Sequence, residues 1–288
     1  MNPISYVFTG AIVNPIATIV AGIYYLLHIL HVSAPLGFSI IILTVIIRLI
    51  LYPFTSAQLK TAKQMQVITP HLNKLKEKHK NDAKKLQEET MALYKEYGVN
   101  PAAGCLPLIV QLPIIWGLYY VLQQIVSTDA KHVVEFVNHA VYIQAFHIQH
   151  AWDTSFFGLP LGESPSKLLS TLGFAVFLVP VLTALFQFVQ SKMMAPVLEK
   201  KLEAVEKEAK KTKNKALVKE VKKEDDFMTA FQSQSMFIFP IMIGFFSWTL
   251  PVGLSFYWNT FTIFGIIQQY AVSGLGGVAD WLPKNKAK

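Results

Sequence analysis

Long apolar runs separated by charged segments dominate the pattern of this sequence. Five runs have lengths near the roughly 20 residues that a helix needs to cross a bilayer: residues 37–54, 101–126, 168–190, 236–250 and 252–272. The last two are short and are separated only by Pro251. The pattern predicts an all-α, polytopic membrane protein with a five-transmembrane-helix core, in agreement with a mean hydropathy of +0.38.

Residues 1–36 precede the first run and carry a helical pattern of their own. Apolar side chains recur at spacings of four and three along one face: Ile12, Ile16, Ile19, Ile23, Leu26 and Leu30. The polar or amphipathic residues Thr18, Tyr25 and His28 fall on another face. This pattern favours an amphipathic helix that lies in the membrane interface. A sixth span remains an alternative, because it would agree equally well with the charges of the loops.

Lysines are concentrated in three segments between and after the runs. Residues 55–100 and 191–235 each hold a lysine block, and the tail 273–288 holds three lysines, whereas residues 127–167 contain only Lys131 and Lys167. Because Lys and Arg mark cytoplasmic loops, we expect the first three segments inside the cell and residues 127–167 outside, with a cytoplasmic C-terminus. The net charge of +8 then reflects topology and attraction to anionic lipids rather than nucleic-acid binding.

Two apolar stripes in residues 55–100 predict a cytoplasmic helical hairpin. One stripe runs from Met65 to His79 and the other from Leu86 to Tyr97. Thr69 followed by Pro70 is typical of a helix start, Asn81 and Asp82 mark the turn, and Gly98 ends the second helix. The Lys/Glu-rich residues 198–226 predict a solvated helix or partial disorder, and Trp152, Phe156 and Phe157 suit the outer membrane interface.

Arg48 lies inside the first run and is the only arginine among 26 basic residues. A charge in hydrocarbon costs about 2.5–3.5 kcal/mol on insertion scales, so Arg48 needs a partner or a hydrated recess. Thr44 and Tyr52, four residues away on either side, share its helix face. Arg48 is therefore the first candidate for a functional residue, although an arginine at this depth could also snorkel to the inner headgroups.

Other polar side chains in the runs fall mainly in the cytoplasmic half and the middle of the membrane. Gln111, Gln187 and Gln190 favour the cytoplasmic half. Ser255, Asn259 and Thr262 share one face of the last run, from its outer portion to its middle. Aromatic residues such as Trp116, Trp248 and Trp258 occupy the outer halves. If the polar faces converge, they line a recess that is open to the cytoplasm and closed outward. The amides could instead be interfacial or could hydrogen-bond neighbouring helices.

Several classes of site find no support in the sequence. Cys105 is the only cysteine, which excludes a disulfide framework, and there is no Gly-rich phosphate loop, HExxH or GxSxG motif. His139, His147 and His150 near Glu135 fit solvated histidines better than a metal site. We expect no cofactor, no metal and no enzymatic activity, and we keep a secondary transporter or channel with a cytoplasm-facing cavity as the alternative function.

Three motifs follow one another in the order of a known family. Residues 44–54 read TVIIRLILYPF, residues 100–113 read NPAAGCLPLIVQLP, and residues 248–258 read WTLPVGLSFYW. With these motifs the chain resembles the YidC/Oxa1/Alb3 membrane protein insertases, from about Gly37 to Tyr270. In its short N-terminal segment the chain resembles the single-membrane bacterial type of this family. It lacks the lipoprotein cysteine of many such members. Its C-terminal tail is short, which argues against strong docking of the ribosome through the tail.

The resemblance implies a function in inserting membrane proteins. A five-span core would hold a groove open to the cytoplasm and to lipid, with Arg48 as the groove arginine and Gln111, Gln187, Trp258 and Asn259 at matching positions. Thr44 and Gln190 complete the expected groove. The implied partners are nascent membrane proteins, the ribosome and anionic lipids, with the Sec translocon and targeting factors as further candidates. The expected location is the bacterial plasma membrane.

Overall fold

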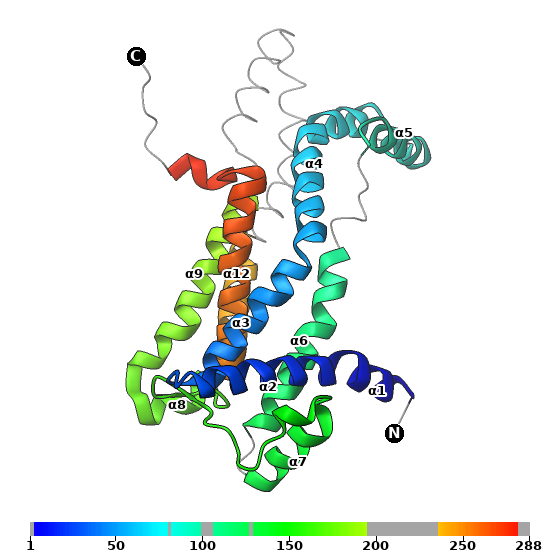
Figure 1. Cartoon of the computed structure of the whole chain (residues 1–288). Coiled ribbons are helices and arrows are strands. Elements are labelled where there is room, and N and C mark those ends of the chain that lie inside the picture. The colour runs from blue at the N-terminus through cyan, green and yellow to red at the C-terminus, as the bar shows by residue number, and fades with distance from the viewer. Residues whose placement is uncertain (1–2, 80–81, 99–105, 127–128, 195–235, 282–288) are drawn as a thin grey trace. The chain divides into compact units, whose positions relative to one another are not determined.

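The computed structural model describes residues 3–79, 82–98, 106–126, 129–194 and 236–281, and helices make up most of this part of the chain (Figure 1). The expected Lys/Glu-rich segment 198–226 and residues 282–288 of the tail lie outside the described residues. The chain is divided into two compact units. Unit 1 contains Met1–Tyr52, Leu108–Phe186 and Ile241–Phe264, and unit 2 contains Pro53–Pro107, Gln187–Pro240 and Gly265–Lys288.

Helices follow one another along the chain with few interruptions. The first half holds α1 (Pro3–Phe8), a π-helical turn (Thr9–Val13), α2 (Asn14–Ile29), α3 (Pro35–Ile50), α4 (Tyr52–Lys78), α5 (Ala83–Glu96) and α6 (Leu106–Ile125). The second half holds α7 (Ala130–Ala140), α8 (Pro165–Leu172), α9 (Leu178–Met194), a helix over Met236–Thr249, and α12 (Val252–Ser273). Short 3₁₀ turns occupy Gln144–Phe146, Gly173–Phe177 and Gly276–Trp281, and β1 (Ser155–Phe156) pairs antiparallel with β2 (Leu159–Pro160).

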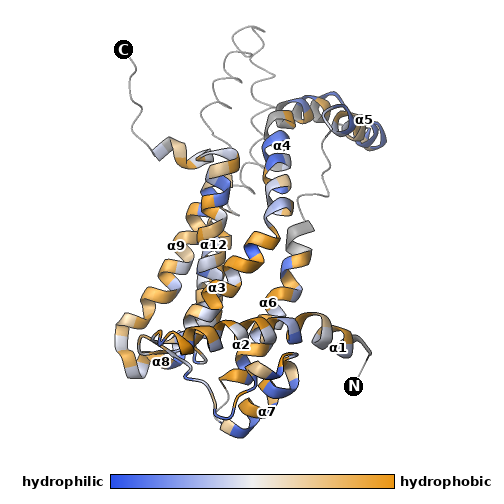
Figure 2. Ribbon diagram, viewed as in Figure 1, coloured by the Kyte–Doolittle hydropathy of each residue, from blue (hydrophilic) through white to orange (hydrophobic). Residues whose placement is uncertain are grey.

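The described helices agree only in part with the five predicted spans. By length and composition, Ser5–Ile29 and Pro165–Met194 could each cross a membrane, and a third span is possible if α3 and the start of α4 count together across the break at Leu51. The helix Met236–Thr249 is apolar but shorter. Figure 2 shows the apolar character of α3, α6 and α9 and the mainly hydrophilic surface of α5. The molecule is thus a mostly helical protein with apolar spans, and the five-helix core stays a prediction.

The N-terminal helix packs on the rest of unit 1 through a face that only partly overlaps the predicted apolar stripe. Its buried side chains are Val13, Ile16, Ala17, Val20, Ala21 and Tyr24. Of the predicted stripe, Ile16 belongs to this buried set, whereas Ile19, Leu26 and Leu30 are exposed. The physical reason is that α2 is apolar on two sides, and the side with small residues packs closely on α3 and α7 of the same unit. In Figure 1, α2 runs across α3 rather than along it.

Residues 129–164 fold against the N-terminal helix within unit 1. Tyr142 donates its hydroxyl to the Gly10 carbonyl over 2.8 Å, and its backbone N–H donates to Thr18 Oγ1 over 3.1 Å. The Trp152 ring stacks on Tyr24 with 4.5 Å between centroids. Close packing also ties the β-hairpin to α3, because a Cβ on Gly37 would lie 1.9 Å from a carbon of the Phe156 ring. The sequence predicts interfacial aromatics here but not this folded cap.

Unit 2 contains the predicted helical hairpin, formed by α4 and α5. Asp82 caps α5 by accepting a hydrogen bond from the Lys85 N–H over 3.0 Å, and Gly98 follows the helix end at a φ of +63°. The predicted helix start at Thr69 and Pro70 is wrong, because α4 passes through both residues without interruption. One unbroken helix keeps the apolar positions before and after residue 70 on a single stripe, with Ile68 fully buried.

The remaining described residues of unit 2 join the ends of three helices. The Gln268 side chain on α12 donates to Thr55 Oγ1 over 2.6 Å and to Ser56 Oγ over 3.0 Å, both at the start of α4. Gly276, at a φ of +52°, lies so close to the Met193 carbonyl that an added Cβ would be 1.8 Å from its oxygen. These contacts fix the C-terminal end of α12 to α4 and α9 inside this unit.

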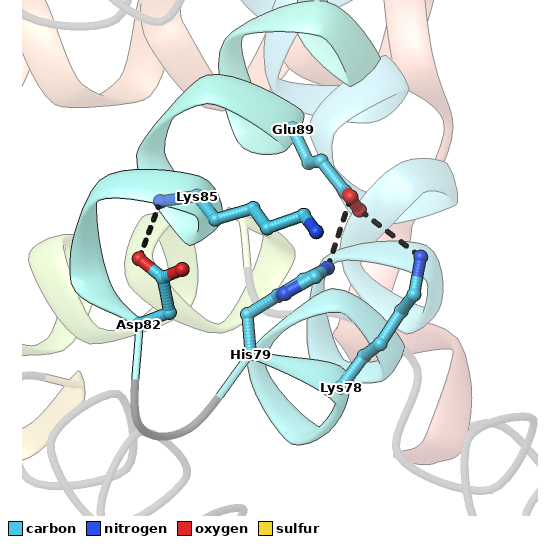
Figure 3. Close-up of polar contacts among 5 residues, drawn as sticks. All are labelled: Lys78, His79, Asp82, Lys85 and Glu89. Carbon is cyan, nitrogen blue, oxygen red and sulfur yellow. Dashed lines mark hydrogen bonds and ion pairs between the residues drawn. The ribbon is translucent and has the colours of Figure 1, made fainter.

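An ionic cluster closes the hairpin at the turn end of α4 (Figure 3). His79 Nε2 lies 3.0 Å from Glu89 Oε1, and Lys78 Nζ lies 3.5 Å from Glu89 Oε2. His79 is buried, whereas Lys78 is exposed. Partial burial raises the pKa of the Glu89 carboxyl, but the hydrogen bond and charge of His79, together with Lys78, outweigh burial and hold this pKa below its ordinary value. The ionised carboxylate therefore stabilises the closed hairpin.

Replacing Glu89 with glutamine should loosen the hairpin at neutral pH. Since the pKa of Glu89 is lower in the folded hairpin, its contribution is present above the ordinary glutamate value of about 4.3. It is lost as the pH falls through the lower, folded-state pKa. Spin labels on α4 and α5 of the full-length protein, measured by pulsed electron resonance, should give a broader distance distribution for Glu89→Gln at pH 7. The wild type should broaden only at a pH below the ordinary glutamate pKa.

Glu88→Gln on the exposed side of α5 is the matched control and should leave the distances unchanged. Equal distributions for Glu89→Gln and Glu88→Gln at pH 7 would show that the cluster does not hold the hairpin closed.

Candidate functional site

The side chain of Arg48 is buried inside unit 1 and binds α12. Only 4% of Arg48 is exposed, although it stands in the last turn of α3. Its Nη2 donates a hydrogen bond to the Phe261 carbonyl, and its Cζ lies 3.4 Å from the centroid of the Phe261 ring. The Phe264 ring is more distant, at 6.0 Å. The guanidinium is thus directed into the unit against α12 rather than outward, as snorkelling would require.

The contacts with Phe261 offset much of the cost of burying Arg48. A cation–π contact contributes about 2 kcal/mol where the cation is desolvated, and a hydrogen bond from a charged donor contributes about 1.5–3 kcal/mol. Their sum is comparable with the insertion cost of about 2.5–3.5 kcal/mol for an arginine in hydrocarbon. An aromatic ring and a carbonyl group can therefore hold this cation without a carboxylate.

Gln111 reaches the same face of α12 from α6. Its Nε2 donates a hydrogen bond to the Tyr257 hydroxyl, and Tyr257 is fully buried. The Tyr257 ring lies 5.9 Å from the Phe261 ring at an interplanar angle of 28°. Gln111, Tyr257, Phe261 and Arg48 therefore form a continuous set of contacts that joins α6, α12 and α3. We call these four residues the arginine cluster.

Tyr257 and Phe261 are functional candidates that the sequence analysis missed. The sequence predicts that aromatic residues of the last run close the recess on its outer side, whereas these two rings contact the predicted groove residues directly. Their spacing of four places them on one helix face, which is a detectable signal. The sequence does not reveal that this face of α12 points toward Arg48.

The other predicted groove residues of unit 1 differ in how their polar atoms are used. Thr44 donates its hydroxyl to the Ile40 carbonyl of its own helix over 2.7 Å, so that hydrogen is not available to a ligand. In the described part of the chain, Arg48 Nε, Asn259 Oδ1 and Thr262 Oγ1 are buried and have no hydrogen-bond partner. Buried polar atoms of this kind can accept a polar ligand at little further desolvation cost. Trp258 is half-buried on the same stretch of α12.

Gln187 and Gln190 belong to unit 2, and both are half-buried near the end of α9. Their convergence with the arginine cluster stays a prediction. Tyr52 belongs to α4, because α3 ends at Ile50, so Tyr52 does not continue the face that carries Thr44 and Arg48.

A second polar cluster in unit 1 joins three helices through hydroxyl groups. Ser247 Oγ lies 2.8 Å from Ser255 Oγ on α12 and 3.2 Å from Thr183 Oγ1 on α9. All three residues are buried. The helices approach closely here, since a Cβ on Gly244 would lie 3.0 Å from the Ala184 Cβ. Ser255, predicted to line the recess with Asn259 and Thr262, therefore takes part in helix packing instead.

Two surface hollows lie elsewhere in the described structure. One of about 410 Å³ is lined by residues of α7 and the following segment, including Lys131, Glu135 and His150. The other, of about 500 Å³, lies on α5 and includes Lys84, Glu88 and Met91. Within the described residues, no three His, Cys, Asp or Glu side chains gather as metal ligands would.

Comparison with known proteins identifies relatives over most of the chain. Residues 28–275 match the family described as 60Kd inner membrane protein. The membrane protein insertase YidC of Fusobacterium nucleatum subsp. nucleatum is 32% identical over 240 residues, which are 83% of this chain and 87% of that relative. The membrane protein insertase MisCA of Bacillus subtilis is 30% identical over 242 residues, covering 83% of this chain and 70% of the relative.

Other matching proteins share only part of their own length with this chain. The inner membrane ALBINO3-like protein 1 of Chlamydomonas reinhardtii chloroplasts is 30% identical over 278 residues, and this chain spans 51% of it. A crystal structure of an active YidC insertase, with its first transmembrane domain resolved, matches with a TM-score of 0.52 and 24% identity. The match covers 95% of this chain and 47% of that one, and it shows the likeness of the fold.

Removing the central hydroxyl of the second cluster should weaken helix packing. Ser247→Ala deletes both of the side-chain contacts with Thr183 and Ser255, and interhelical hydrogen bonds in membranes contribute roughly 0.6 to 1.7 kcal/mol. We expect a lower unfolding temperature in detergent, measured by intrinsic tryptophan fluorescence. Thr249→Ala on the exposed side of the same helix, where the hydroxyl contacts only backbone of its own helix, should change little. If Ser247→Ala and Thr249→Ala shift the unfolding temperature equally, the hydroxyl cluster does not contribute to helix packing.

Proposed function

We propose that this chain, which belongs to the YidC/Oxa1/Alb3 (60Kd inner membrane protein) family of membrane protein insertases, uses the arginine cluster to receive polar ends of its substrates. It is a membrane protein insertase, and its substrates are nascent membrane proteins. This family function is not enzymatic. Because the chain belongs to an insertase family, we no longer keep a transporter or channel as the alternative function.

The observation that carries the proposal is the position of Arg48 against the polar stretch of α12. The guanidinium contacts Phe261, and the buried, unpartnered oxygens of Asn259 and Thr262 lie within two residues of that contact along the helix. Together these groups offer a positive charge and hydrogen-bond acceptors inside apolar helices. Such a site suits the polar end of a polypeptide, which carries carboxylates as well as backbone N–H groups.

The proposal also names the residues that line the groove and the side of the membrane to which the groove opens. Its walls are Thr44, Arg48, Gln111, Trp258 and Asn259, in a core of five membrane-spanning helices. The groove opens to the cytoplasm, where the hairpin and the C-terminus lie, and residues 127–167 are outside. The crossing of α2 over α3 in Figure 1 supports an N-terminal helix that lies in the outer interface.

Insertion follows from three physical contributions. The groove shortens the hydrocarbon path for a polar tail, and the short final spans thin the bilayer locally. Arg48 attracts acidic residues of the tail, and outward movement of each negative charge gains roughly 2.3 kcal/mol per 100 mV of inside-negative potential. The apolar segment of the substrate then slides along the exposed helices into lipid, without any covalent step.

The cytoplasmic segments provide the place where substrates arrive. The hairpin and the lysine-rich segments would meet chains coming from the ribosome or from targeting factors, with the Sec translocon as a further partner. Their lysines also suit anionic lipid headgroups at the inner surface of a bacterial cell membrane.

Arg48→Ala should impair insertion of substrates with acidic tails. We expect a loss of roughly tenfold or more in the insertion rate of a single-span substrate with an Asp-rich tail, since a missing charge contact near ε of about 20 exceeds 1.4 kcal/mol. Arg48→Lys should lose less, because it keeps the charge but not the planar fork. Protease protection of the translocated tail in proteoliposomes measures the effect.

An otherwise identical substrate with an Asn-rich tail is the matched control and should be far less sensitive to Arg48→Ala. Lys131→Ala, outside the cluster, checks for general effects of losing a positive charge. If Arg48→Ala, Arg48→Lys and the wild type insert the acidic substrate at the same rate, the charge does not contribute and the proposal is wrong.

A further inference from the structure

We infer that Phe261 limits the preference of the insertase for acidic substrate tails, because its ring and a substrate carboxylate compete for the guanidinium of Arg48. This inference rests on the proposed function of the arginine cluster. It assigns the Phe261 ring of that cluster a role of its own, and it explains how a covered arginine can serve as a receiving site.

Phe261 covers Arg48 with two different groups. Its carbonyl accepts the hydrogen bond from Nη2, and its ring faces the guanidinium at 3.4 Å, well inside the range of about 6 Å for cation–π contacts. Because only 4% of Arg48 is exposed, a carboxylate can form a bidentate pair with the guanidinium only after the ring moves aside. The backbone carbonyl remains in place in any substitution of the Phe261 side chain, so mutation isolates the contribution of the ring.

The ring of Phe261 is held in position by its neighbour on α12. Tyr257 stacks on it at 5.9 Å, and Tyr257 is itself fixed by the hydrogen bond from Gln111 on α6. The ring therefore has a defined resting place over Arg48. Phe264, one turn further, lies at 6.0 Å from Arg48 Cζ, at the outer limit of the same type of contact.

Competition by an uncharged ring has two consequences for the insertion cycle. A neutral tail has no group that binds Arg48 more strongly than the Phe261 ring does. The ring therefore stays over Arg48, and the arginine does not stabilise binding of the neutral tail. An acidic tail displaces the ring, and the return of the ring favours release of that tail once the substrate moves outward. Phe261 thus keeps the binding of acidic tails weak.

The test compares acidic and neutral tails in variants of residue 261. A photocrosslinkable amino acid is placed in the tail of a single-span substrate that carries either four Asp or four Asn residues, and adducts with the full-length insertase are measured in membranes. Phe261→Leu removes the ring and keeps the apolar volume. We expect the acidic-to-neutral adduct ratio to rise about three- to tenfold, as loss of a competing cation–π contact implies.

Pentafluorophenylalanine at position 261 provides a second variant that keeps size and shape. Fluorination withdraws electron density from the ring face, so the contact with the guanidinium weakens without loss of packing. The acidic-to-neutral ratio should rise in the same direction as for Phe261→Leu. Phe264→Leu is the matched control on the same helix and should have a clearly smaller effect.

The outcomes separate this inference from the proposed function. In an Arg48→Ala background, Phe261→Leu should no longer change the ratio, because the competed cation is absent. If Arg48→Ala impairs acidic tails while Phe261→Leu and the fluorinated variant behave like Phe264→Leu, the role of Phe261 is refuted and the groove proposal stands. If Arg48→Ala has no effect on acidic tails, the groove proposal itself fails.

Discussion

The cost of placing a guanidinium among apolar helices is the constraint on which the described structure depends most. The five apolar runs contain no Asp or Glu, so Arg48 cannot form an ion pair within them. An aromatic ring and a backbone carbonyl stabilise the cation instead. Unlike a carboxylate, these partners leave the positive charge uncancelled. Arg48 is thereby stabilised in the resting protein and still attracts an acidic chain.

Polar groups in unit 1 are divided between two physical roles. The hydroxyls of Thr183, Ser247 and Ser255 bond one another and hold three helices together. Asn259 and Thr262, further along α12, keep buried oxygens without partners in the described residues. A short distance along one helix therefore separates groups that contribute to packing from groups that can serve a ligand. This division explains why polar residues on one face of a span need not share one function.

Local rules account for much of what the sequence predicted correctly. The two helices of the hairpin, the turn marked by Asp82 and the stop at Gly98 depend on neighbouring residues, and α4, α5 and the residues beside them show these features. The need of Arg48 for a partner followed from charge alone. Contacts between helices were not predictable, because lipid is as apolar as a protein core and periodicity cannot tell a lipid-facing side from a packed one. The buried face of α2 and the Phe261 contact with Arg48 both depend on that distinction.

The continuity of α4 through Pro70 shows a related limit. A threonine followed by proline is a good local signal for a helix start, yet a stripe that extends before and after it favours a single helix. Local capping signals and long-range packing then predict different helix boundaries. Packing determines the boundary where a nearby side chain, such as that of Ile68, is fully buried.

The magnitudes indicate which step of insertion the arginine cluster controls. Transfer of about 20 apolar residues into a bilayer, at roughly −0.3 to −0.6 kcal/mol each, yields about −6 to −12 kcal/mol. A single contact between Arg48 and a carboxylate contributes less than this, and it is broken again when the tail moves outward. The cluster therefore has little influence on the final equilibrium, which the apolar helix of the substrate determines. Its influence falls on the barrier for entry of the polar tail, where a difference of about 1.4 kcal/mol changes a rate tenfold. A site with this task needs a charge that becomes accessible after displacement of a single uncharged ring, and the ring of Phe261 over Arg48 meets that requirement.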